Sequence, residues 1–230
     1  MENRMVSRPS RLWKLLGVLG STAAAAVALQ VTAEGAASGS GSEHVTTSPA
    51  YWFWDSDTVA GSSKLVRSQK GVSFTYKTSN LTPGHVVTVW VVVFNNPELC
   101  ATTPCTPADV GNPDNPGVQS DFLYGGGHII GGSGRGNFGG HLRVGDTSGS
   151  GLAEVGGTAV GLLNPETAEI HLALHSHGPM VPGQILKEQL TTFLGGCQTF
   201  LGPDGLADGP EDMPVAVGEC STFQGSIHQP

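Results

Sequence analysis

The segment from His85 to Phe94 is an almost unbroken run of valine with one tryptophan and one threonine. The turn-forming sequence Asn80-Leu-Thr-Pro-Gly84 precedes it, and Asn95-Asn-Pro97 follows it. A β-branched run of this length, bounded by turn residues, is typical of a central strand that is covered on both faces. We therefore expect a β-structure that surrounds or sandwiches this strand.

Further strand patterns occur on both sides of this segment. Val72, Phe74 and Tyr76 alternate with polar residues, which indicates a half-buried strand. Two hairpins are predicted, one joining 122–130 to 137–144 through the turn 131–136, the other joining 158–163 to 169–175. The apolar stripe over 183–194 predicts one helix, and 220–228 reads as a closing strand.

Glycine is concentrated between residues 122 and 155, inside the first predicted hairpin, and the whole chain has 34 glycines. Glycine this dense in strands permits bulges or close backbone approach. The predicted fold is mainly β: a single β-sandwich or a barrel-like sheet with one short helix and two disulfides.

The N-terminal residues 1–33 are expected to be a signal peptide, with a second cleavage position after residue 37. Four basic residues precede an apolar stretch over 15–31 that is rich in Leu, Ala and Val: Arg4, Arg8, Arg11 and Lys14. An uncleaved membrane anchor is the alternative. Residues 34–49 are expected to form a flexible leader, and 50–230 a single β-rich domain.

Removal of residues 1–33 would leave 7 Lys+Arg (11 − 4) and 18 Asp+Glu (19 − 1), a net charge of −11. Nucleic acids and anionic membrane surfaces both favour positively charged proteins, so this charge disfavours them as partners. We expect a secreted or periplasmic protein of the cell envelope, with an unknown extracellular ligand and no membrane span after signal cleavage.

Four cysteines, an even number, lie in the part expected to be exported. In an oxidising compartment this predicts two disulfides, and proximity favours Cys100–Cys105 and Cys197–Cys220 among the three pairings. A zinc site is the alternative, although the chain contains no Cys-x-x-Cys motif.

Three histidines, His171, His175 and His177, lie within seven residues and point to one face if the segment is a strand. His171 and His175 would then lie about 13 Å apart, too far to share an ion, and His175 and His177 about 6.6 Å apart. A metal site would need ligands from neighbouring strands, and the predicted set for copper or zinc is His128, His141, His171 and His177. The alternative is a polar, solvent-facing row.

A helix over the same segment is the competing interpretation. Asn164 and Pro165 are typical of a helix N-terminus, and His171 and His175 would then lie one turn apart. The strand is favoured because Leu172 would fall outside the apolar stripe of such a helix and because strands dominate the surrounding sequence.

The sequence Tyr51-Trp-Phe-Trp54 places four aromatic residues together. Aromatic residues at the start of a β-domain often fill its core, but they also form stacking platforms for sugars. Trp52 and Trp54 are therefore candidates for a ligand-binding face.

No set of catalytic residues comes together in the sequence. The Gly134–Gly139 segment matches G-x-G-x-x-G, but a predicted strand follows it where a dinucleotide site needs a helix. The nucleophile motif Gly-x-Ser-x-Gly is absent. We therefore expect no catalytic residue and no cofactor, apart from the copper or zinc of the alternative.

Several motifs resemble an uncharacterised family of secreted bacterial β-rich proteins: Leu81-Thr-Pro-Gly84, Gly127-His128, Asn137-Phe138-x-Gly140-His141-Leu142, Ala168-Glu-Ile-His171 and Gly195-Gly196-Cys197. The resemblance covers most of residues 80–230 and implies an exported β-domain with no established activity. The shorter motif His175-Ser-His177-Gly-Pro179 resembles the His-x-His-Gly-Pro element of chordin-type domains, which are extracellular β-modules without accepted catalysis.

The sequence thus leads to two functional hypotheses. The first is a secreted, non-catalytic binding or surface module of unknown ligand. The second is a copper- or zinc-binding protein, including the case of a metalloenzyme, with a histidine cluster on neighbouring strands.

Overall fold

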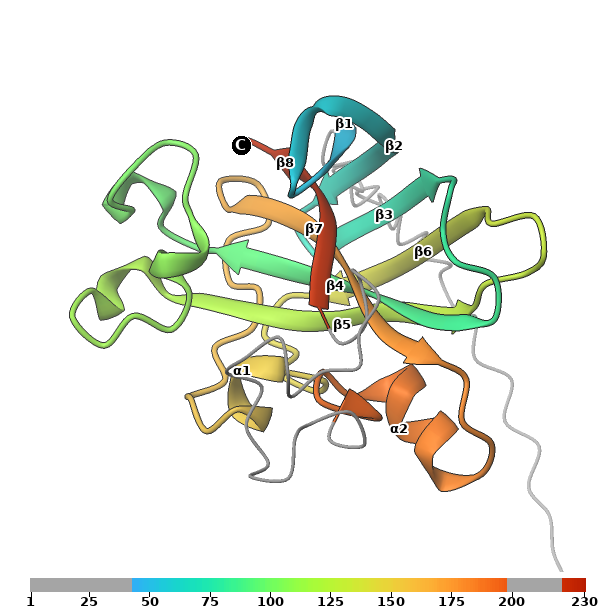
Figure 1. Ribbon diagram of the computed structural model, residues 1–230. Coiled ribbons are helices and arrows are strands. Elements are labelled where there is room, and N and C mark those ends of the chain that lie inside the picture. Colours follow the sequence, from blue (N-terminus) through green and yellow to red (C-terminus); the bar gives the residue numbers. More distant parts are fainter. Residues whose placement is uncertain (1–42, 198–220) are drawn as a thin grey trace, which may run out of the picture. The chain divides into compact units, whose positions relative to one another are not determined.

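The computed structural model describes residues 43–197 and 221–230. Most of this part of the chain is β-structure, with two short α-helices and three 3-10 helices (Figure 1). The strands are β1 (His44–Trp52), β2 (Asp55–Ser68), β3 (Gly71–Thr78), β4 (His85–Phe94), β5 (Ser120–Ile129), β6 (Gly136–Arg143), β7 (Glu169–Pro179) and β8 (Ser221–His228). The helices are η1 (Pro97–Leu99), η2 (Pro107–Asp109), η3 (Pro116–Val118), α1 (Gly151–Glu154) and α2 (Gln184–Thr191).

All eight strands belong to one antiparallel sheet in the order β5-β4-β7-β8-β1-β2-β3-β6. The sheet curls until its two edges, β5 and β6, come into contact, so that it is nearly closed into a barrel. The barrel-like alternative of the predicted fold is therefore confirmed, and the β-sandwich is not formed.

The predicted hairpin between 122–130 and 137–144 is wrong in its pairing, although both strands exist. β5 pairs with β4, β6 pairs with β3, and the two strands meet only across the seam of the barrel. A Cβ atom on Gly140 would lie 2.3 Å from the carbonyl oxygen of Gly125, so glycine is what allows the backbones to approach here. The ring of Phe74 covers both glycines from inside the barrel.

The second predicted hairpin is also wrong, because residues 158–163 form no strand and Leu162 makes only an isolated bridge to Val144. The other predicted strand of this hairpin, residues 169–175, is confirmed as part of β7, which lies between β4 and β8. The strand interpretation of the histidine segment therefore holds over the helical one. The strands over 72–76, 85–94 and 220–228 and the helix over 183–194 are confirmed as β3, β4, β8 and α2.

Two strands were not expected. β1 begins at His44, so residues 44–49 of the predicted leader belong to the sheet. β2 lacks an apolar alternation because its inward positions include Ser63 and Arg67, both of which are buried. The interior of the barrel is therefore apolar on the side of β3, β4 and β7 and polar near β1, β2 and the end of β8.

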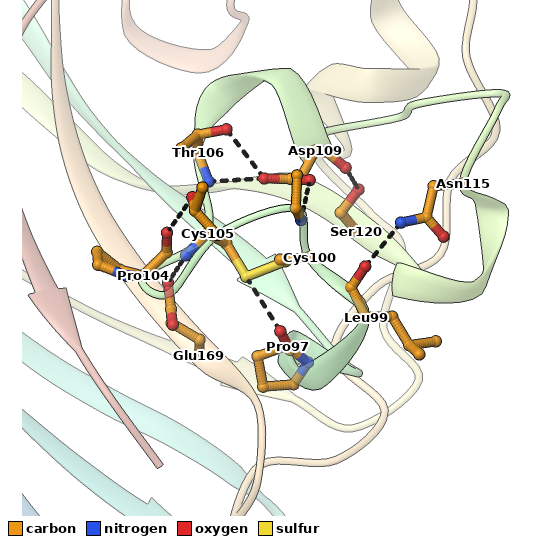
Figure 2. The surroundings of a disulfide bond; sticks show 12 residues. Pro97, Leu99, Cys100, Pro104, Cys105, Thr106, Asp109, Asn115, Ser120 and Glu169 are labelled. Atoms are coloured by element: carbon orange, nitrogen blue, oxygen red, sulfur yellow. Dashed lines mark hydrogen bonds between the residues drawn. A yellow bond between two sulfur atoms is a disulfide. The ribbon is translucent and has the colours of Figure 1, made fainter.

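One disulfide, rather than two, is present among the described residues (Figure 2). It joins Cys100 to Cys105 and pins the loop between β4 and β5, as predicted. The backbone N–H of Cys105 donates to the Glu169 carboxylate at the start of β7 (2.8 Å), which ties this loop to the barrel. The second predicted pair includes Cys220, which lies outside the described residues.

The outer face of β4, β5 and β7 is covered by α1, α2 and the segment that follows α2. Trp90 of β4 packs there edge-on against the rings of Phe122, Tyr124 and Phe193. The apolar layer explains why the central strand is buried on both faces. In the part of the chain that the structure describes, none of the helices has the length and apolar character needed to cross a membrane.

Candidate functional site

A small cavity opens at one end of the barrel, where β1 and β7 end and β4 and β8 begin. Its volume is about 160 Å³. It is lined by aromatic, apolar and polar side chains: Trp52, Trp54, Asn80, Leu81, Thr82, His85, Val87, Ser176 and Phe223. We call this site the barrel mouth.

Three aromatic rings form one wall of the barrel mouth. The ring centroids of Trp52 and Trp54 lie 4.6 Å apart, and Trp54 is stacked on Phe223 at 6.4 Å with an interplanar angle of 27°. Phe223 is buried, whereas Trp54 is 55% exposed. The predicted ligand face of Trp52 and Trp54 is thus part of a real concavity, with Phe223 as a third ring.

The turn before β4 also lines the barrel mouth, and main-chain hydrogen bonds hold it in place. Leu81 N–H donates to the carbonyl oxygen of Gly134 at 2.9 Å, and Gly84 N–H donates to that of Ile130 at 2.8 Å. Asn80 has a φ of 62°, in the left-handed region, where asparagine is more common than most residues. The polar side chains of this turn are therefore presented from a fixed backbone.

The four predicted metal ligands do not converge. His128 stacks on Phe138 across the barrel seam, with ring centroids 4.4 Å apart, and His141 is exposed on β6 and hydrogen-bonded to Ser73. The expected site assumed that β5 and β6 pair with each other next to β7, and they do not. His171 and His177 lie on the outer face of β7 and have separate partners.

His171 is hydrogen-bonded through Nε2 to the Glu169 carboxylate and packs against Phe94. Burial by itself would raise the pKa of Glu169, but the hydrogen bond and charge of His171 outweigh it and lower that pKa. Glu169 also accepts from the Cys105 N–H and the Gln229 amide, so this group ties the ends of three segments together.

The other two histidines of the row lie against a cysteine instead. His175, His177 and Cys197 are all buried, and one ligand atom of each lies within 4.8 Å of the other two. The segment after α2 brings Cys197 onto the outer face of β7. We call these three residues the His–Cys cluster.

Each imidazole of the cluster is held by a threonine hydroxyl at its other nitrogen. Nδ1 of His175 lies 3.1 Å from Oγ1 of Thr222, and Nε2 of His177 lies 2.9 Å from Oγ1 of Thr88. The indole N–H of Trp90 also donates to Thr88 (2.9 Å), and Nδ1–H of His177 donates to the Gly195 carbonyl (2.7 Å).

Both cluster histidines are neutral at neutral pH. Burial lowers the pKa of His177 to about 4, against the opposing effect of its hydrogen bond to Gly195. Burial, with a smaller contribution from the neighbouring His177, lowers the pKa of His175 well below its usual value. Neutral imidazole is the form that binds metal ions.

Only part of these sites could be found from the sequence. The aromatic motif identified Trp52 and Trp54. Phe223 comes from a distant segment without a motif, and the turn motif that contains Asn80 predicts a turn rather than a binding site. For the His–Cys cluster, the sequence showed that His175 and His177 are two residues apart and can point to one face of a strand. Cys197 was predicted to form a disulfide and was therefore not considered as a ligand.

Comparison of the chain with protein-family models gave no match, and searches of curated proteins and of solved structures gave none either. The resemblance to secreted bacterial β-proteins and to chordin-type domains therefore stays a prediction.

Proposed function

We propose that this protein is a secreted, non-catalytic binding module that holds the terminal sugar ring of a glycan in the barrel mouth. The observation that carries the proposal is that Trp52, Trp54 and Phe223 line the same cavity as several short polar side chains. The C–H face of a sugar ring packs on aromatic surface, and its hydroxyls need nearby hydrogen-bonding groups. The mouth offers both.

The size of the cavity limits what can enter it. Sites for drug-sized molecules have volumes of about 300–1,000 Å³, so a cavity of about 160 Å³ accommodates one ring rather than a chain of them. The mouth opens at the end of the barrel, so the remainder of a longer glycan would lie outside. A terminal sugar unit fits these limits.

The polar lining consists of Asn80, Thr82, His85 and Ser176, all of which can hydrogen-bond to sugar hydroxyls. Asn80, Thr82 and Ser176 donate and accept hydrogen bonds without titrating near neutral pH. None of the described residues that line the barrel mouth has a carboxylate, and glycoside hydrolysis usually requires a pair of them. This composition supports the non-catalytic version of the proposal.

The proposal is tested with a glycan array probed with the full chain, followed by titration with the free terminal monosaccharide of each hit. We expect at least one hit and quenching or enhancement of tryptophan fluorescence on titration. Trp54→Ala is expected to weaken binding at least tenfold with little loss of stability, because this side chain is largely exposed.

Phe53→Ala is the matched control. Phe53 is an aromatic residue of the same turn with a similar exposure of 57%, but it does not line the cavity. Binding should persist in this variant. The absence of any array hit, or equal binding by Trp54→Ala and the unmodified chain, would contradict the proposal.

A further inference from the structure

The His–Cys cluster is separate from the barrel mouth and has the arrangement of a metal site. His175, His177 and Cys197 are 4%, 0% and 6% exposed. Among the described residues, no other group of three His, Cys, Asp or Glu side chains brings its ligand atoms this close together. The cluster also differs from the set predicted from the sequence, with which it shares only His177.

The distances around the Cys197 sulfur fit metal coordination. Sγ lies 3.8 Å from Nε2 of His175 and 3.8 Å from Nδ1 of His177. Metal–nitrogen and metal–sulfur bonds of about 2.0 and 2.3 Å place the two atoms about 3.8 Å apart when the angle at the metal is about 120°. Both nitrogen–sulfur distances therefore match an ion bound between the sulfur and each nitrogen. The two nitrogens, which lie within 4.8 Å of each other, would have to lie about 3.5 Å apart around a trigonal ion, so binding draws the rings together.

The second nitrogen of each imidazole has the kind of partner that metal-binding histidines have. In metal sites this nitrogen donates to an oxygen that fixes the ring orientation. Thr222 occupies this position for His175 and Thr88 for His177. Both are hydroxyls, which can accept a hydrogen bond from the ring.

We propose that His175, His177 and Cys197 bind one copper ion. Thiolate together with imidazole is a soft to borderline donor set that suits copper, and trigonal His₂Cys sites are characteristic of copper proteins. Zinc usually takes a fourth ligand, often water. The rings of Phe193 and Trp90 close the cluster on its outer side, with the Phe193 ring 4.5 Å from that of His175, so a three-coordinate ion is favoured.

Binding of Cu(I) changes the protonation of two residues. The Cys197 thiol loses its proton to solvent as the sulfur–copper bond forms. On His177 the hydrogen bond from Nδ1 to the Gly195 carbonyl breaks and that oxygen moves aside. The proton passes from Nδ1, which then binds copper, to Nε2, which donates to Thr88. One proton is therefore released for each copper ion bound, and no electron is transferred.

The test is a titration of the untagged full chain with Cu(I) against a competing chelator, together with X-ray absorption of the copper-loaded protein. We expect one copper per chain, one proton released per copper, and a first shell of two nitrogens and one sulfur. The absorption measurement uses the unmodified chain, so it does not depend on whether a variant folds.

Variants locate the site. Cys197→Ser and His175→Asn are expected to lower copper affinity about 100-fold or more. His141→Ala, which removes an exposed histidine on β6, should bind copper as the unmodified chain does. Cys220→Ser should also bind copper, since the proposed ligands are His175, His177 and Cys197.

Several results would overturn the proposal. The first is that the chain binds no copper when the two are mixed in equal amounts. The second is a copper coordination shell without sulfur. The third is a Cys197→Ser variant with unchanged copper affinity, and the fourth is a chain that binds zinc but not copper. Peptide mapping that finds a Cys197–Cys220 disulfide in a chain that takes up no copper has the same consequence. Glycan binding at the barrel mouth is measured separately, so failure of one proposal leaves the other standing.

Discussion

The hydroxyl of Ser63 lies 2.8 Å from Nε2 of His228 inside the barrel, and the hydroxyl of Thr46 lies 2.8 Å from Nδ1 of the same ring. His228 is 1% exposed. Burial, followed by the positive charges of Arg67 and His171, lowers the pKa of His228 to about 4. The ring is therefore neutral in the native protein at neutral pH.

The lowered pKa of His228 predicts that the free energy of unfolding decreases in acid. The unfolded chain protonates His228 near pH 6.5 and the native chain only near pH 4, so the unfolded state binds more protons between these values. The free energy of unfolding should fall by about 1.4 kcal/mol per pH unit from this residue as the pH drops from 6.5 to 4. Urea unfolding of the unmodified chain and of His228→Gln over this range measures the difference in slope. His44→Gln, at an exposed position of β1, should keep the slope of the unmodified chain.

Arg67 should contribute strongly to stability although none of the described residues pairs a carboxylate with it. Its guanidinium is fully buried and donates to the carbonyl oxygens of Pro165, Ala168, His228 and Gln229. Arg67→Met leaves these acceptors unpaired and should lower the free energy of unfolding by roughly 3 kcal/mol or more. Chemical denaturation measures the loss. Arg143→Met, on the exposed face of β6, should change it by less than about 0.5 kcal/mol.

The barrel seam should not tolerate a side chain at Gly140. A Cβ atom there would meet the Gly125 carbonyl at 2.3 Å and the Phe74 ring at 2.7 Å. Gly140→Ala is therefore expected to destabilise the protein by about 1–3 kcal/mol, measured by thermal or urea unfolding. Gly132→Ala serves as the control, because a Cβ at Gly132 meets nothing within 4 Å. Equal stability of the two variants would show that the edges do not meet at Gly140.

The disulfide should have a modest effect, because the loop that it closes is short. Cys100 and Cys105 are separated by 5 positions, which in the chain-entropy model corresponds to about 2 kcal/mol. The double variant Cys100→Ser/Cys105→Ser should lose about this amount of unfolding free energy. Reductant should lower the stability of the unmodified chain to that of the double variant and leave the variant itself unchanged.

Much of the sheet could be predicted from local patterns. β3, β4 and β7 contain alternating or continuous apolar residues bounded by turns, and the corresponding strands were found at nearly the predicted residues. β2 was missed because its inward residues Ser63 and Arg67 are polar, so that a buried strand looked like a solvated segment. Ser63 is paired with the side chains of Ser226 and His228, and Arg67 with the carbonyls of Pro165 and Ala168, all more than 90 residues away in the chain.

The candidate sites were likewise predicted in part from local sequence patterns and decided in part by the tertiary structure. Trp52 and Trp54 were identified because neighbouring aromatic residues are conspicuous in any sequence, but the cavity that they line depends on Phe223, 169 positions after Trp54. His128 and His141 were grouped on the assumption of a hairpin, and pairing of β5 with β4 and of β6 with β3 separates them.

The sequence by itself determined that this chain forms a glycine-rich β-structure with one central strand buried on both faces, a short helix and a small disulfide loop. These features depend on residues close together in the chain, through side-chain alternation, turn chemistry and loop length. The tertiary structure alone decided that the sheet closes at a glycine seam, that polar residues lie inside it, and that Cys197 faces His175 and His177. Strand order and register decide such contacts, and these depend on packing between distant segments rather than on the pattern within any one of them.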